Sequence, residues 1–115
     1  MDQPQHTETP ESLAPRLLVL LISHWITQTL SVAAELGLPD LLASGPQSSA
    51  SLAQATGVHA PSLHRLLRAL VTLDIVRERE DGDFELLPMG ALLGHDAATS
   101  LRSWALVVGR YQWPA

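Results

Sequence analysis

The 115-residue chain contains no cysteine and no lysine. The lack of cysteine excludes disulfide frameworks, thiolate zinc sites and thiol catalysis, and makes a reducing cytoplasm the compartment we expect. The seven basic residues are all arginine, twelve residues are acidic, and the net charge is −5. Nucleic-acid binding draws its affinity from clustered Lys and Arg that neutralise phosphates. The charge therefore argues against a nucleic-acid partner.

Several other signals are missing. Residues 1–11 are polar, include Pro4 and Pro10, lack the basic start of a signal peptide, and are predicted to form a flexible tail. The seven glycines are scattered singly, so no glycine-rich cofactor loop follows a strand. Five histidines share no ligand spacing of the His-x3-His kind: His6, His24, His59, His64 and His95. We expect no cofactor-binding, metal or catalytic residue within this chain.

Residues 48–87 follow the plan of a winged helix-turn-helix. Ser48 is the expected N-cap of a first helix, which Gly57 ends. A second helix starts at Pro61 and carries apolar residues at i, i+3, i+4, i+7 and i+8: Leu63, Leu66, Leu67, Leu70 and Val71. Residues 75–80 and 83–87 flank Asp81-Gly82, which predicts a hairpin wing with a type I′ turn and both turn residues at positive φ.

Residues 12–36 predict one long helix or two nearly continuous ones, with Gly37 and Pro39 at the end. The six consecutive apolar residues 17–22 cover every face of this helix, because each residue advances about 100°. Three explanations are open: a core helix of this chain, a membrane span, or burial against a second copy. A membrane span needs roughly 18 apolar residues, and Ser23-His24 interrupts the run. The expected dimer-interface residues are Leu17, Leu18, Leu21, Ile22, Trp25 and Ile26.

Beyond the wing, Ser100 is expected to cap a last helix. Apolar residues recur along that helix at helical spacing: Leu101, Trp104, Ala105, Val108 and Tyr111. A stripe of this kind is most often core. The last residues, 113–115, carry no capping pattern, and we expect the chain to be part of a longer protein.

Arg65 and Arg68 lie on the helix that would enter a major groove in a DNA-binding regulator. The hairpin, however, carries five acids that would repel a phosphate backbone: Glu78, Glu80, Asp81, Asp83 and Glu85. The other interpretation is that the two arginines pair with acids of this chain or of a following domain.

Taken in order, these segments resemble the N-terminal dimerisation domain of the S-adenosylmethionine-dependent O-methyltransferases that act on plant phenolics and bacterial polyketides. The resemblance covers almost the whole chain. It rests on an ordered set of short segments: Thr27-Gln28, Val32-Ala33-Ala34-Glu35-Leu36-Gly37-Leu38, Asp40-Leu41-Leu42, Gly45-Pro46, Leu52-Ala53, Thr56-Gly57, Leu63 with Arg65-Leu66-Leu67-Arg68-Ala69-Leu70, Phe84 with Leu86, Pro88 and Gly90, and Ser100-Leu101-Arg102. It implies a mainly α-helical winged helix-turn-helix that has exchanged DNA binding for homodimerisation, with a long N-terminal helix that intertwines with that of its partner.

The resemblance further implies that catalysis and S-adenosylmethionine binding lie in a C-terminal Rossmann-like domain, for which 115 residues have no room. The expected layout is a flexible tail at residues 1–11, a winged-helix dimerisation domain at 12–98, and at 99–115 the start of a linker helix toward that catalytic domain. In such enzymes this helix lines part of the acceptor pocket. Contact with an aromatic acceptor in the full-length enzyme is therefore expected from Trp104, Val107, Val108 and Tyr111.

The sequence thus predicts the homodimerisation domain of an O-methyltransferase of specialised metabolism, without nucleic-acid or membrane partners. His24 is expected as a hydrogen-bonded histidine at the dimer seam, or against substrate. The alternatives are a winged-helix transcriptional regulator and a stand-alone ligand-binding relic of the methyltransferase fold.

Overall fold

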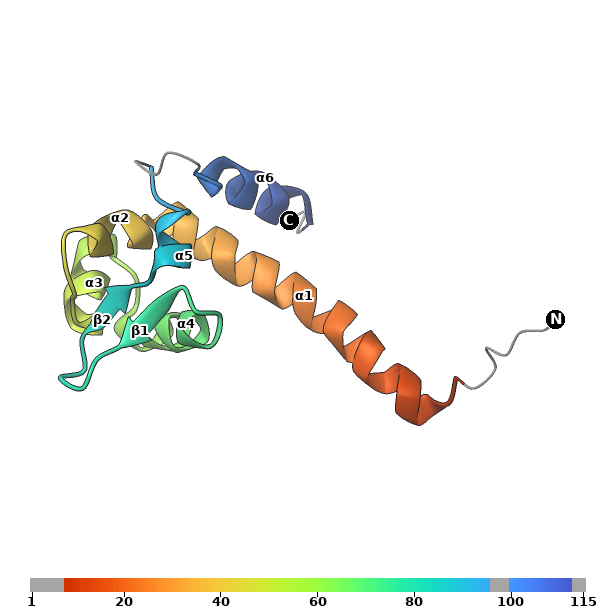
Figure 1. Cartoon of the computed structure of the whole chain (residues 1–115). Helices are drawn as coiled ribbons and strands as arrows, with labels where there is room; N and C mark the ends of the chain where they lie inside the picture. The colour runs from red at the N-terminus through yellow and green to blue at the C-terminus, as the bar shows by residue number, and fades with distance from the viewer. Residues whose placement is uncertain (1–7, 96–99, 113–115) are drawn as a thin grey trace.

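A long helix projects from a small body of short helices and one β-hairpin in the computed structural model (Figure 1). The structure describes residues 8–95 and 100–112. The elements in chain order are α1 (Pro10–Leu36), α2 (Leu38–Ala43), α3 (Ser49–Thr56), α4 (Ala60–Thr72), β1 (Val76–Glu78), β2 (Phe84–Leu86), α5 (Pro88–Ala91) and α6 (Arg102–Gln112). The predicted fold class, mainly helical with a small wing and a long leading helix, is confirmed.

The leading helix is continuous, and it begins at Pro10 rather than at the expected Ser12. Thr9 is the N-cap: its hydroxyl accepts from the Ser12 N–H at 3.3 Å, and the Thr9 N–H donates to Ser12 Oγ at 2.9 Å. Pro10 and Glu11 are therefore helical, whereas residues 1–7 of the predicted tail lie outside the described residues. Gly37, with φ of 74°, ends the helix as predicted.

The helix-turn-helix consists of α3 and α4. Ser48 Oγ accepts from the Ser51 N–H at 3.1 Å, and Gly57 ends α3 in the left-handed conformation, both as predicted. Helix α4 buries Leu63, Leu67 and Leu70 completely. These residues join the main core, which consists of Ala33, Leu38, Leu42, Leu52, Ala53, Leu63, Leu67, Leu70, Ile75, Val76, Phe84 and Leu93.

The hairpin pairs β1 with β2, with Val76 opposite Leu86 and Glu78 opposite Phe84. The predicted two-residue type I′ turn is wrong. The Gly82 N–H donates to the Arg79 carbonyl at 3.0 Å, and within this turn only Gly82 has a positive φ, of 91°. The loop is a three-residue connection with its glycine in the left-handed region. Asp81 Oδ1 accepts from the Asp83 N–H at 3.0 Å, which holds the acid inside the turn.

The second half of α1 crosses the body and buries Ala33 and Ala34. Helix α6 lies beside this half, as Figure 1 shows. The two helices approach closely at Gly109, where an added Cβ would lie 1.9 Å from Ser31 Oγ. The two helices thus pack through small residues, and α6 covers one side of α1.

Candidate dimerisation surface

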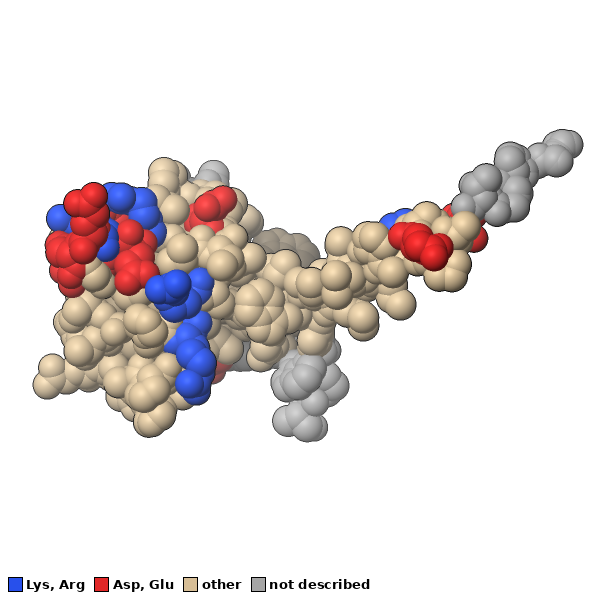
Figure 2. Space-filling model, turned by 90° about the horizontal axis from the view of Figure 1, so that it is seen from below, with Lys and Arg blue, Asp and Glu red and all other residues tan. Residues whose placement is uncertain are grey.

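The first half of α1 leaves the body with its apolar residues uncovered (Figure 1). Leu17, Leu18 and Leu21 are 57%, 54% and 65% exposed, and Val19 and Leu20 are equally bare. No charged residue lies between Arg16 and Glu35, and Figure 2 shows this stretch of the projecting helix without charged side chains. The explanation of residues 17–22 as a core helix of this chain is therefore wrong. Exposed apolar surface of this extent marks an interaction site.

The other predicted interface residues lie where α1 enters the body. Ile22 and Trp25 are 40% and 49% exposed, whereas Ile26 is half-buried. Ile26 lines an apolar hollow of about 300 Å³, which is also lined by Leu30, Leu73, Ile75, Met89, Leu92, Leu93 and Leu101. The assignment of all six residues to a dimer interface stays a prediction.

A second groove, of about 360 Å³, runs between α1 and α4. It is lined by Trp25, Gln28, Thr29, Val32, Leu36, Val58, Ser62, Leu63 and Leu66. Among the residues that the structure describes, Gln28 Oε1 has no hydrogen-bond partner, although the atom is buried. Sequence reasoning did not single out Gln28, because its surroundings depend on how α4 packs against α1.

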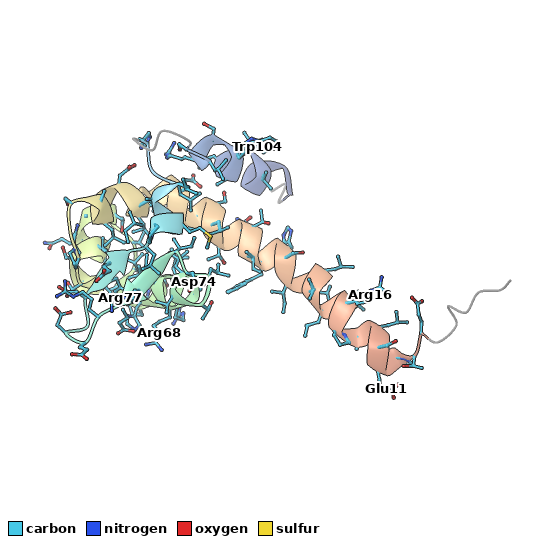
Figure 3. The ribbon with its side chains drawn as sticks, in the orientation of Figure 1. Glu11, Arg16, Arg68, Asp74, Arg77 and Trp104 are labelled. Atoms are coloured by element: carbon cyan, nitrogen blue, oxygen red, sulfur yellow. The ribbon has the colours of Figure 1, made fainter. Side chains whose placement is uncertain are left out.

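The predicted acceptor-contact residues on α6 are only partly brought together. Trp104 and Val107 are 67% and 45% exposed and line a shallow hollow with Ser103. Figure 3 shows Trp104 on the side of α6 that faces away from α1. Val108 is half-buried, and the side chain of Tyr111 lies outside the described part of the chain. The predicted role of these four residues is not tested by this geometry.

Arginines of the wing region pair with acids of the hairpin. Arg68 binds Glu78 with an N–O distance of 3.0 Å, and Arg77 binds Glu85 at 2.8 Å. Figure 3 shows Arg68 and Arg77 at the hairpin end of the body. Pairing within the chain is thus confirmed for Arg68. Arg65 makes no ion pair with any residue in the described ranges.

A polar clasp between Asp40 and His95 was not predicted, because 55 residues separate them. His95 Nδ1 lies 2.5 Å from Asp40 Oδ2, and the His95 N–H donates to Asp40 Oδ1 at 2.9 Å. Burial raises the pKa of Asp40, but the His95 hydrogen bonds and the charges of His95 and Arg102 outweigh it, so the pKa lies below its usual value. The clasp ties α2 to the turn after α5. Within residues 8–95 and 100–112, no three His, Asp or Glu side chains are grouped to hold a metal.

Of the described helices, α1 alone is long and apolar enough to cross a membrane by length and composition. Its second half, however, is packed into the body, where Thr29, Ser31, Ala33 and Ala34 are buried. The part free of the body, residues 10–24, spans about 22 Å at 1.5 Å per residue, against the roughly 30 Å of a bilayer core. This length does not favour a membrane span.

Residues 18–94 match the family described as the O-methyltransferase dimerisation domain. Over 103 residues the chain is 39% identical to the phenazine O-methyltransferase PhzM of Lysobacter antibioticus, a match that covers 90% of this chain and 30% of that enzyme. The structure is similar, with a TM-score of 0.79 and 41% identity, to the N,N-8-amino-8-demethyl-D-riboflavin dimethyltransferase RosA of Streptomyces davawensis, covering 83% and 28% of the two chains.

A further similar structure is the O-methyltransferase NcsB1 from neocarzinostatin biosynthesis, in complex with S-adenosyl-L-homocysteine and 1,4-dihydroxy-2-naphthoic acid. Its TM-score is 0.64 at 37% identity, over 69% of this chain and 24% of that one. The chain thus spans about 30% of the length of the enzymes that it matches. The family match over residues 18–94 covers most of α1, the helix-turn-helix and the wing, and the chain belongs to the O-methyltransferase dimerisation domain family.

Proposed function

We propose that this chain is the homodimerisation module of an O-methyltransferase of specialised metabolism, and that two copies bury the first halves of their α1 helices against each other. The observation that carries the proposal is the uncovered apolar run 17–22. Burying apolar surface stabilises association by about 25 cal/mol per Å² before ordering costs. The uncharged stretch between Arg16 and Glu35 supports a contact whose strength depends little on salt.

Two other partners fit less well. A duplex-binding regulator needs several free basic side chains on α4, whereas Arg68 is paired with Glu78 and leaves Arg65 as the one arginine of α4 without an ion pair among the described residues. A membrane needs a longer free helix than residues 10–24 supply. We further propose a cytoplasmic location, which the absence of cysteine supports.

The test is the molar mass of the purified chain, by light scattering on a sizing column at low and high salt. We expect a dimer at both, and a soluble monomer for Leu21→Asp, because a carboxylate at a residue 65% exposed in the single chain would be desolvated in the dimer. Gln54→Asp places the same charge on the exposed surface of α3 and should leave the dimer intact. A Leu21→Asp dimer would contradict the proposal.

We also propose that the whole protein binds S-adenosylmethionine outside this chain and holds an aromatic acceptor partly against α6. In the NcsB1 complex, S-adenosyl-L-homocysteine and a dihydroxynaphthoic acid are bound together, which supports both ligands. On α6, the exposed side chains of Trp104 and Val107 offer an apolar surface to a planar ring. Val108 and Tyr111 would extend the same wall.

In the full-length enzyme, Trp104→Ala should raise the KM for the acceptor, with little effect on the affinity for S-adenosylmethionine. Gln54→Ala, on the exposed surface of α3, is the control, because it lies outside α6. Acceptor kinetics unchanged by Trp104→Ala would remove α6 from the acceptor site while leaving the dimer proposal standing.

A further inference from the structure

One face of α1 carries a regular seam from the projecting half into the body. Its residues are spaced alternately by four and three: Ala14, Leu18, Leu21, Trp25, Gln28 and Val32. This is the heptad spacing by which two helices pack along their length. Leu18, Leu21 and Trp25 are exposed, whereas Gln28 and Val32 line the groove between α1 and α4. The seam thus joins the uncovered half of the helix to the groove.

Gln28 is the one polar residue of the seam. Its Oε1 is buried without a hydrogen-bond partner in the described part of the chain, which is unfavourable because the buried oxygen has lost its hydrogen bonds to water. A polar side chain at a seam position selects the register in which it finds a partner. The seam therefore has a preferred register only if the second helix brings a hydrogen-bond donor to Gln28.

We propose that, in the homodimer proposed above, the two α1 helices pack antiparallel with Trp25 of each copy against the partner's Gln28. In this register the indole N–H of the partner's Trp25 can donate to Oε1, once the Gln28 amide turns about its freely varying terminal torsion. The first half of each α1 then lies in the groove between α1 and α4 of the other copy. The inference rests on the proposed homodimer and adds its geometry.

In neighbouring registers of the two helices, the residue opposite Gln28 supplies no hydrogen-bond donor. Sliding one helix outward by about one heptad places the partner's Leu18 opposite Gln28, and a leucine supplies no donor. A further slide places Glu11 there and pairs the two 17–22 runs only with each other, which leaves most faces of both runs in water. Two-fold symmetry makes each contact occur twice, so that both Gln28 amides are satisfied together.

The lengths also agree. The groove is lined along α1 from Trp25 to Leu36, and the projecting half supplies a similar length of helix. In the proposed register the partner's Leu21 meets Val32. The partner's Leu18 lies opposite Glu35, an exposed residue at the end of the seam, and no charged side chain lies on the seam between Leu18 and Val32.

Because the chain has no cysteine, introduced cysteines report the register without background. The double variant Leu21→Cys with Val32→Cys should form a disulfide-linked dimer on mild oxidation, since the two positions of opposite copies are in contact. Each single variant should remain unlinked, because the two copies of either position lie about 16 Å apart along the seam. Val19→Cys with Val32→Cys is the matched control: Val19 is as exposed as Leu21 but lies on another face of α1.

The same samples are sized after reduction, which separates the two hypotheses. A monomer overturns both the homodimer and its register. A dimer that crosslinks through Leu21→Cys alone, or equally through the Val19 control, keeps the homodimer and overturns the register. Gln28→Leu is the second variant: we expect it to remain dimeric but to lose the preference for the 21–32 disulfide by several-fold, and an unchanged preference would contradict the role of Gln28.

Discussion

At Gly109 the absence of a side chain lets α6 lie directly on α1. An added Cβ would lie 1.9 Å from Ser31 Oγ and 2.4 Å from Ser31 Cβ, so Gly109→Ala must push the two helices apart. We expect a loss of about 1–3 kcal/mol in the free energy of unfolding, measured by urea titration. Ser103→Ala, on the outer face of α6, should change it by less than about 0.5 kcal/mol. Equal stabilities of the two variants would show that α6 does not pack here.

The Asp40–His95 clasp gives stability a defined pH dependence. The pKa of Asp40 is lower in the folded chain than in the unfolded one, so its contribution is fully present above the unfolded value and is lost as pH falls through the folded value. The melting temperature should therefore fall as the pH drops below the ordinary aspartate value of about 4, partly because of Asp40. Asp40→Asn should flatten this dependence, whereas Glu35→Gln, an exposed acid on α1, should keep it.

Single residues show where sequence reasoning succeeds and where it stops. Ser48 and Gly57 were predicted because each acts on the backbone within a few residues of itself. The start of α1 was misplaced, although Thr9 and Ser12 already stand at capping-box spacing. The turn at Asp81 was wrong because its own carboxylate binds the Asp83 N–H and favours a three-residue loop. The His95 contact depends on tertiary packing alone.

At the scale of the element, α1 has one composition and two environments. Its second half is packed between the body and α6, whereas the apolar residues 17–22 of its first half are exposed. The apolar run 17–22 covers every face of the helix and therefore indicated an unusual helix. It did not indicate which half of the helix the body would cover. That division is decided by where α4 and α6 pack, which is why Gln28 was missed.

The difference between the two halves predicts their behaviour in a monomer. Isolated helices of about 12–15 residues are marginal in water. In the Leu21→Asp monomer, amide hydrogens of residues 12–22 should exchange many-fold faster than in the native dimer, whereas those of residues 29–36 should stay protected. Hydrogen-exchange mass spectrometry measures both in one experiment. Equal protection of residues 12–22 in monomer and dimer would mean that a second copy does not stabilise the helix.

Across the whole molecule, charge and apolar surface are segregated. Figure 2 shows most charged side chains on the body, with the acidic ones concentrated at its outer end, while the projecting helix is uncharged up to its tip. At that tip Arg16 pairs with Glu8, with an N–O distance of 3.3 Å. The winged-helix fold was predictable from residue spacing. What the fold can bind depends on where its charged and apolar side chains lie. In a DNA-binding winged helix, α4 and the hairpin would present free basic side chains. Here Arg68 and Arg77 form ion pairs with acids of the hairpin, and the exposed apolar surface lies on α1.

This segregation leads to the last prediction, that the chain does not bind duplex DNA. The net charge is −5, and the hairpin acids hold Arg68, Arg77 and Arg79 in ion pairs, so few counterions would be released on contact with phosphates. Fluorescence anisotropy of a labelled duplex should show no saturation up to about 100 µM protein at roughly 50 mM salt, the range of ordinary non-specific binding. Glu80→Arg with Asp83→Arg reverses two hairpin charges, one exposed and one half-buried, and should introduce weak, salt-sensitive binding. If the unmodified chain bound DNA and lost affinity tenfold or more by roughly 200 mM salt, α4 would be a recognition helix after all.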